Sequence, residues 1–197
     1  MNWGSVILNL VIIVGMTLSL IYFFSPHEGR TWWENGKLSL RYFTIQSNIV
    51  VYLAAIVMLV YQLKGNEIPF GVTLFKYVGT LLVTITFLVV MIYLGPVYGY
   101  KDQLSGVNFY VHVIGPLAAL LSLCIFEKNG YMSIGQCFIA FIPALVYGII
   151  YMYRVVISKS WDDFYGFATN TKWYISFMVL LVFVSLVCLG VRFLYNI

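Results

Sequence analysis

Six apolar stretches of about 20 residues each constrain the fold of this chain more than any other feature of its sequence. The hydrocarbon core of a bilayer is about 30 Å thick, and an α-helix needs roughly 20 apolar residues to cross it. The backbone finds no water there, so each crossing segment must bond internally as a helix. The sequence therefore predicts an all-α polytopic membrane protein, a bundle of six transmembrane helices. The predicted spans are residues 5–24, 40–63, 72–94, 108–126, 133–153 and 172–195.

The charge content supports the same class of protein and limits its partners. Charged residues make up 9% of the chain, whereas a soluble domain carries about 25%. With 197 residues, the chain has room for a single six-helix transmembrane domain, residues 1–197, and no separate soluble domain. Its net charge of +4 comes from scattered Lys and Arg residues. We therefore expect no nucleic-acid partner, and no protein partner can be inferred.

The start of the second span carries polar side chains inside an apolar run. On an α-helix Thr44, Ser47 and Asn48 stand at positions i, i+3 and i+4, so they share one face. Lipid offers these groups no hydrogen-bond partner. We expect this face to turn toward other helices or toward a cavity.

His112 is an ionisable residue about one turn inside the fourth span, where such a residue indicates a function by default. A neutral histidine bonded to a neighbouring helix is the structural alternative. Spans two and four both start on the side opposite the two chain ends, which we call the loop side. Thr44 and His112 both lie about four residues inside their spans, roughly 6 Å below the helix starts. If the two helices are neighbours, the imidazole can take the proton of the Thr44 hydroxyl and activate it as a nucleophile.

Several further residues are candidates for supporting roles, and each has a structural alternative in interhelical bonding. Asn108 can orient the imidazole, Ser47 and Asn48 can donate to an oxyanion, and Asp162 or Asp163 can stabilise an imidazolium. Two residues at the start of span two are candidates for substrate binding. Arg41 can hold a carboxylate or bind lipid phosphate. Tyr42 belongs to a set of loop-side aromatic residues that form either an interfacial belt or the mouth of a lipid-binding cavity.

Other kinds of site are disfavoured by the residue inventory. A zinc site needs three or four His, Cys or carboxylate ligands, but the chain has two histidines and we expect its carboxylates to lie in loops. The three cysteines form no CxxC pair, and no G-x-S-x-G, P-loop or dinucleotide-binding glycine motif occurs. We therefore predict neither a metal nor a cofactor.

The motifs Phe43-Thr44-Ile45-Gln46-Ser47-Asn48 and Val111-His112-Val113-Ile114-Gly115-Pro116, together with six spans in 197 residues, resemble a known family. It is the androgen-induced-gene and androgen-dependent TFPI-regulating protein family, and especially its bacterial six-span members. The animal members are threonine hydrolases that cleave fatty acid esters of hydroxy fatty acids (FAHFAs). The resemblance implies a Thr44 nucleophile, a His112 base, a lipid substrate within the bilayer and a multi-pass location in a bacterial plasma membrane.

Three hypotheses follow from the sequence. The preferred one is a membrane-embedded lipid ester hydrolase that uses Thr44 and His112. The alternative is a small transporter, channel or lipid-binding protein; against it, we expect no span other than the fourth to carry an ionisable residue well inside the membrane. The third treats the polar residues of span two and His112 as purely structural interhelical partners.

Overall fold

The computed structural model describes residues 2–168 and 172–197. Within these residues there is no β-strand, and six helices are long and apolar enough to cross a membrane. This confirms the predicted all-α membrane bundle. The six spans are Trp3–Phe24, Phe43–Leu63, Phe70–Tyr98, Val107–Phe126, Ile134–Ile157 and Trp173–Asn196.

Three spans are single α-helices and three are divided by wide π turns. The single helices are α1 (Trp3–Phe24), α3 (Phe43–Leu63) and α10 (Trp173–Asn196). The third span is α4 (Phe70–Val89), η1 (Val90–Leu94) and α5 (Gly95–Tyr98). The fourth is α7 (Val107–Phe109), η2 (Tyr110–Ile114), α8 (Gly115–Leu121) and η3 (Ser122–Phe126), and the fifth is α9 (Ile134–Met152) and η4 (Tyr153–Ile157).

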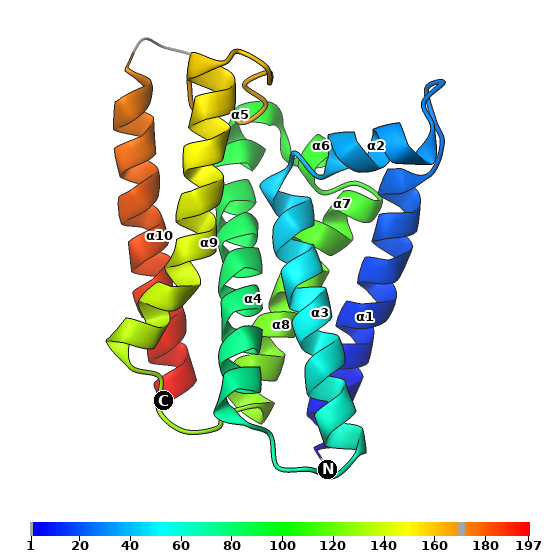
Figure 1. The fold of residues 1–197 in the computed structure, drawn as a ribbon, viewed down its shortest axis with the longest axis vertical. Helices are drawn as coiled ribbons and strands as arrows, with labels where there is room; N and C mark the ends of the chain where they lie inside the picture. Colours follow the sequence, from blue (N-terminus) through cyan, green and yellow to red (C-terminus); the bar gives the residue numbers. More distant parts are fainter. Residues whose placement is uncertain (1, 169–171) are drawn as a thin grey trace.

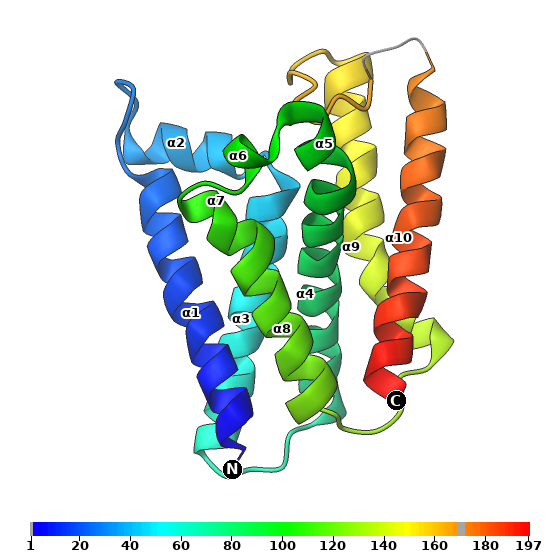
Figure 2. The ribbon, with the colours of Figure 1, turned by 180° about the vertical axis from the view of Figure 1, so that it is seen from behind.

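The spans run alternately up and down, so both chain ends lie at the same end of the bundle (Figure 1). Helix α4 is central and packs against α3, α8 and α9. Helix α1 packs against α3 and α8 on one flank, and α10 packs against α9 on the other, as the reverse view also shows (Figure 2). Spans two and four are therefore neighbours that run in the same direction.

The surface of the bundle is apolar, as lipid contact requires. Large hydrophobic side chains are exposed along the outer faces of α1 and α10, for example Leu18, Val182 and Leu186. The interior is filled mainly by apolar and aromatic side chains from α4, α9 and α10, including the fully buried Tyr77 and Leu81.

The loop side differs from the sequence prediction in several places. Residues 27–37 look like a polar loop, but they contain most of α2 (Trp32–Ser39), which lies across the loop side (Figure 1). Thr31 and Glu34 close a capping box that fixes its start. The second span begins at Phe43 rather than near residue 40, because Tyr42 has an extended backbone and serves as the N-cap.

The third span continues past Gly95-Pro96, where the sequence predicts that it stops. The π turn η1 precedes this pair and runs into α5 without a break. Pro96 has no N–H to donate, and the Met91 carbonyl, five residues before it, accepts the Tyr100 hydroxyl at 2.7 Å instead. The same arrangement recurs in span four, where η2 precedes Gly115-Pro116. His112 lies at the centre of η2, so the wide turn that accommodates the proline also carries the candidate base.

Candidate functional site

Thr44 and His112 lie side by side near the loop-side ends of their spans. Thr44 is the second residue of α3, and His112 projects from η2 on the neighbouring span. The Thr44 Oγ1 atom is 3.4 Å from His112 Nε2. The His112 side chain is almost fully buried, with 7% of the residue exposed. The structure thus brings the two residues together, although not at the equal depth that the sequence indicates, because Thr44 is the second residue of its span and His112 is the sixth.

The second ring nitrogen of His112 determines which tautomer is present. His112 Nδ1 lies 2.7 Å from the backbone carbonyl oxygen of Gln103, which ends the short helix α6 (Tyr100–Gln103). A carbonyl can only accept a hydrogen bond, so Nδ1 carries the proton and Nε2 presents a lone pair to the Thr44 hydroxyl. This is the tautomer that a general base requires.

The residue that orients the imidazole is therefore Gln103, which the sequence did not suggest. The interaction uses a backbone carbonyl, and every residue has one, so no residue type marks it. Asn108, the candidate for this role, lies nearby but donates its side-chain amide to the Asp102 carbonyl at 3.2 Å.

A cavity of about 560 Å³ opens beside the pair, and we call it the polar cavity. Its volume falls within the range of small-molecule sites, about 300–1,000 Å³. It is formed by α1, α2, α3, the segment between spans three and four, η2 and the loop before span six. Its lining residues are Phe23, Ser39, Tyr42, Thr44, Ile45, Leu94, Tyr98, Asp102, Gln103, Asn108, Val111, His112, Phe164 and Tyr165.

Thr44 also lines a second, much narrower space of about 60 Å³, which we call the apolar slot. The slot runs from Thr44 between α4 and η1 on one side and α9 and α10 on the other. It shares Thr44, Leu94 and Tyr165 with the polar cavity. The Thr44 hydroxyl thus lies where a polar space and an apolar space meet.

Tyrosines hold the first turn of α3 in place. The Tyr165 hydroxyl accepts a hydrogen bond from the Phe43 N–H at 2.8 Å, and the Tyr147 hydroxyl donates to the Arg41 carbonyl at 2.8 Å. Tyr165 lies in the loop before span six, where burial raises the pKa of its hydroxyl to about 12. This tyrosine therefore stays neutral at physiological pH and keeps a proton that it can donate.

Ser47 and Asn48 face other helices and are not among the described residues that line either space. The Ser47 hydroxyl lies 2.9 Å from Thr86 Oγ1 on α4. The Asn48 amide donates to the Thr44 carbonyl at 2.9 Å and to the Val111 carbonyl at 3.0 Å, which ties α3 to η2. The Ser47 hydroxyl also donates to the Thr44 carbonyl at 3.0 Å. This arrangement fits the interhelical role for both residues.

Replacing Ser47 with alanine is expected to change stability slightly and ester turnover by less than about twofold. Hydrogen bonds between membrane helices are worth about 0.6 kcal/mol on average. The free energy of unfolding in mixed micelles and the rate of ester hydrolysis, measured on the same preparation, check this expectation. A loss of turnover without loss of stability would instead assign Ser47 a direct part in the chemistry.

The aspartate candidates lie in the loop before span six and bond elsewhere. The Asp163 carboxylate accepts hydrogen bonds from the Tyr151 hydroxyl at 2.6 Å and from the N–H groups of Phe167 and Ala168 at 3.1 and 2.7 Å. Asp162 accepts the Phe164 N–H through its backbone carbonyl at 3.0 Å. The structure gives neither aspartate a hydrogen bond to the imidazole, and Asp163 instead organises its own loop.

The two substrate-binding candidates differ in their positions. Tyr42 lines the polar cavity, and its ring packs against Phe164 with the centroids 4.6 Å apart. Arg41 takes part through its backbone, because its carbonyl accepts the Tyr147 hydroxyl, and it is not among the described residues that line the polar cavity.

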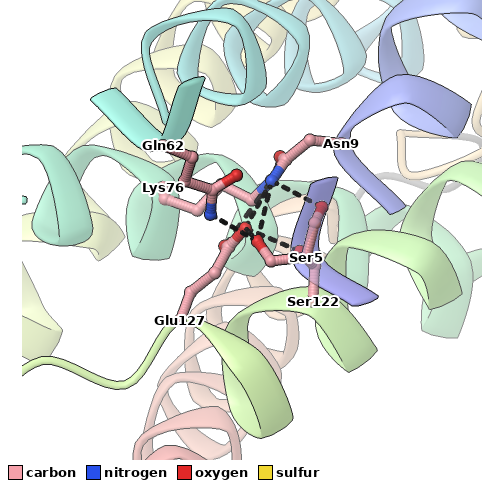
Figure 3. Close-up of polar contacts among 6 residues, drawn as sticks. All are labelled: Ser5, Asn9, Gln62, Lys76, Ser122 and Glu127. Carbon is pink, nitrogen blue, oxygen red and sulfur yellow. Dashed lines mark hydrogen bonds and ion pairs between the residues drawn. The ribbon is translucent and has the colours of Figure 1, made fainter. Parts of the chain in front are cut away.

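A second polar cluster lies near the opposite end of the bundle and was missed in the sequence (Figure 3). Lys76 on α4 and Glu127 after η3 are fully buried side chains, with Nζ and Oε2 3.7 Å apart. Glu127 Oε1 accepts hydrogen bonds from Ser5 at 2.6 Å, Asn9 at 2.5 Å and Ser122 at 2.7 Å. Lys76 donates to the Asn9 side-chain oxygen.

This cluster corrects one expectation, which placed no ionisable residue well inside any span but the fourth. It is wrong, because Lys76 lies buried within α4. Glu127 lies in the segment after η3, as expected of a carboxylate, but its side chain is buried and pairs with Lys76 where four segments meet. The polar residues Asn9 and Lys76 inside the apolar runs of spans one and three are the signal that could have revealed the cluster.

Comparison with known proteins does not assign the chain to a family. No protein-family model, curated protein or solved structure matches the chain.

Proposed function

We propose that the protein is a membrane-embedded lipid ester hydrolase with Thr44 as nucleophile and His112 as general base. The observation that carries this proposal is the 3.4 Å approach of Thr44 Oγ1 to the unprotonated Nε2 of a buried, oriented imidazole. The separation is slightly long for a hydrogen bond, as is common for catalytic groups without substrate. The adjoining polar cavity supplies room for an ester group and for water.

The reaction proceeds in two halves. In the first, His112 Nε2 takes the Thr44 hydroxyl proton while Oγ1 attacks the ester carbonyl carbon. The tetrahedral intermediate collapses, the bond to the alcohol oxygen breaks, and His112 returns the proton to that oxygen. In the second, His112 deprotonates a water molecule and the resulting hydroxide attacks the acyl carbon. The bond from that carbon to Thr44 Oγ1 breaks, His112 returns the proton to Oγ1, and the fatty acid is released.

The Tyr165 hydroxyl is the candidate donor to the developing oxyanion. Thr44 lies in the first turn of a 21-residue helix, where the helix dipole favours negative charge. The Tyr165 hydroxyl lines both spaces beside Thr44 and accepts the Phe43 N–H, so its own proton can point to the oxyanion. Preorganised donors of this kind are worth about 10²–10³ in rate.

The family resemblance supports the same two roles and narrows the substrate. It implies a nucleophilic Thr44, a His112 base and fatty acid esters of hydroxy fatty acids as the substrate class. It also implies a bacterial plasma membrane as the location. We include this substrate class and this location in the proposal, together with the general ester hydrolase activity.

A lipid-binding or transport protein is the second candidate. The buried Lys76–Glu127 pair favours it, because intramembrane ionisable residues often mark ion or substrate pathways. That pair lies near the opposite end of α4 from Thr86, which faces the Thr44 region, about 15 Å along the helix. The two polar centres are thus separate. A lipid-binding or transport function does not explain why an oriented imidazole lies beside Thr44.

A fluorophosphonate probe tests the hydrolase proposal directly. A nucleophilic hydroxyl displaces fluoride from the phosphorus and forms a stable covalent adduct. We expect the wild-type protein to be labelled on Thr44, the Ser47→Ala variant to be labelled equally, and the Thr44→Ala and His112→Ala variants to remain unlabelled. Equal labelling of wild type and Thr44→Ala, or ligand binding without any labelling, would favour the second candidate.

A further inference from the structure

A third space adjoins the apolar slot and is lined in part by residues exposed on the lipid-facing surface, and we call it the lateral groove. It has a volume of about 390 Å³ and lies between α4 and η1 on one side and α10 on the other. It shares Val89, Phe167 and Leu180 with the apolar slot. Neighbouring spaces therefore share wall residues, in the order polar cavity, apolar slot and lateral groove.

The character of the lining changes along this path. The polar cavity contains Asp102, Gln103, Asn108 and His112. The slot is lined mainly by aliphatic and aromatic side chains. The groove is apolar apart from Ser176 and Tyr93, and its rim residues Ile92 and Val179 are each 63% exposed, as expected for residues that face lipid. A molecule with one polar and one long apolar part would match this change in polarity if the bond that joins the two parts lies at Thr44.

We infer that the slot and groove bind the straight acyl chain of the ester, while the polar cavity binds the alcohol part. The inference rests on the proposed hydrolase function and adds the orientation, the access route and the substrate shape. The acyl chain enters from the bilayer between η1 and α10, so the substrate need not leave the membrane. The slot is narrow, with a volume of about 60 Å³, so we expect it to hold only a few methylene groups of one unbranched chain, and the rest of the chain to lie in the groove.

Gly148 on α9 sets the width of the slot. A Cβ atom at this position would lie 3.1 Å from Phe177 Cε2 on α10, and both residues line the slot. A larger side chain here must therefore occupy the space of the acyl chain or push α10 away. Gly190 on α10 offers a matched control, because nothing lies within 4 Å of a Cβ added there.

The first test compares 4-methylumbelliferyl esters with chains of four to sixteen carbons. In Gly148→Leu we expect kcat/KM for the sixteen-carbon ester to fall on the order of tenfold or more, and that for the four-carbon ester to change little. In Gly190→Leu the chain-length profile should match the wild type. Equal losses at all chain lengths in Gly148→Leu, or a selective loss of long chains in Gly190→Leu, would overturn the inference.

The second test examines access through the lateral groove. Val179 lines the groove, whereas Val182 on the same helix is not among its lining residues, and the two are 63% and 59% exposed. In proteoliposomes, Val179→Trp should slow hydrolysis of a long-chain ester several-fold and Val182→Trp should not. Identical rates in the two variants would exclude this route.

A binding measurement separates failure of this inference from failure of the proposed function. A palmitate analogue with a diazirine in its chain should crosslink to residues 144–152 and 177–184 in the wild type and much less in Gly148→Leu. If no ester is hydrolysed in a Thr44-dependent way but this pattern holds, the hydrolase proposal fails and the chain site remains. If esters are hydrolysed but crosslinks fall elsewhere, the chain site fails and the hydrolase remains.

Discussion

Replacing Thr44 or His112 with alanine is expected to lower kcat/KM for a long-chain ester by about 10³–10⁴ in either case, and replacing both by no more than that. Residues that act as one unit show such non-additive losses, because the proton transfer fails once either member is removed. The residual rate would come from substrate binding and from the Tyr165 hydroxyl. Steady-state hydrolysis by the four proteins in the same detergent measures the effect.

Two matched variants control for the chemistry of the substitutions. Thr84→Ala removes a threonine hydroxyl that bonds to the Thr80 carbonyl of its own helix at 2.7 Å. His27→Ala removes the other histidine, which lies exposed and contacts the Ser25 carbonyl. Both variants should keep near wild-type activity. Additive losses for Thr44 and His112, each well below 10³, would show that the two residues do not act as a pair.

Two simple counts placed Thr44 and His112 at one level, but in the structure Thr44 is the second residue of its span and His112 is the sixth. Each residue lies about four positions inside an apolar run, and both runs start on the same side of the membrane. Hydrophobic run length fixes the spans, and the helical rise converts a count into depth. Which spans are neighbours depends on packing, which these counts do not contain, so the 3.4 Å contact required the structure.

The surroundings of the pair were less predictable for a different reason. The imidazole is oriented by the Gln103 backbone carbonyl and the first turn of α3 is held by the Tyr165 hydroxyl. Both contacts depend on how loops fold back over the ends of the spans. Asn108 has the helical spacing to reach His112, but the π turn η2 changes the register at this point. An inference from sequence spacing assumes a regular α-helix, and it is wrong where the helix widens into a π turn.

Lys76 was missed because it lies about one turn inside the apolar run of span three, where a lysine usually extends its side chain to the interface. Glu127 directly follows the apolar run of span four, the ordinary position of a solvated residue. In the structure both side chains turn inward and bond to polar residues of span one, and Gln62 of span two donates to Ser5 in the same cluster. A buried ion pair of this kind is recognised only when both partners are placed.

Replacing Lys76 with methionine is expected to destabilise the protein by about 3–5 kcal/mol, the usual cost of leaving an uncompensated buried charge. Glu127 would lose its cation while remaining sealed among α1, α4 and η3. Titration with a denaturing detergent in mixed micelles measures the free energy of unfolding. Lys64→Met is the control, since Lys64 is exposed at the end of α3, and it should change stability by less than about 0.5 kcal/mol.

The double variant Lys76→Met/Glu127→Gln separates charge compensation from packing. Glutamine keeps an oxygen that can accept from Ser5, Asn9 and Ser122, but it carries no charge, so no unpaired ion remains. We expect it to be more stable than Lys76→Met alone, because replacing both members of a buried pair is often nearly neutral. If the two single losses simply add, the residues stabilise the bundle independently and the ion pair contributes nothing. Ester turnover should stay close to wild type in the folded fraction of each variant, because the cluster lies about 15 Å along α4 from the Thr44 region.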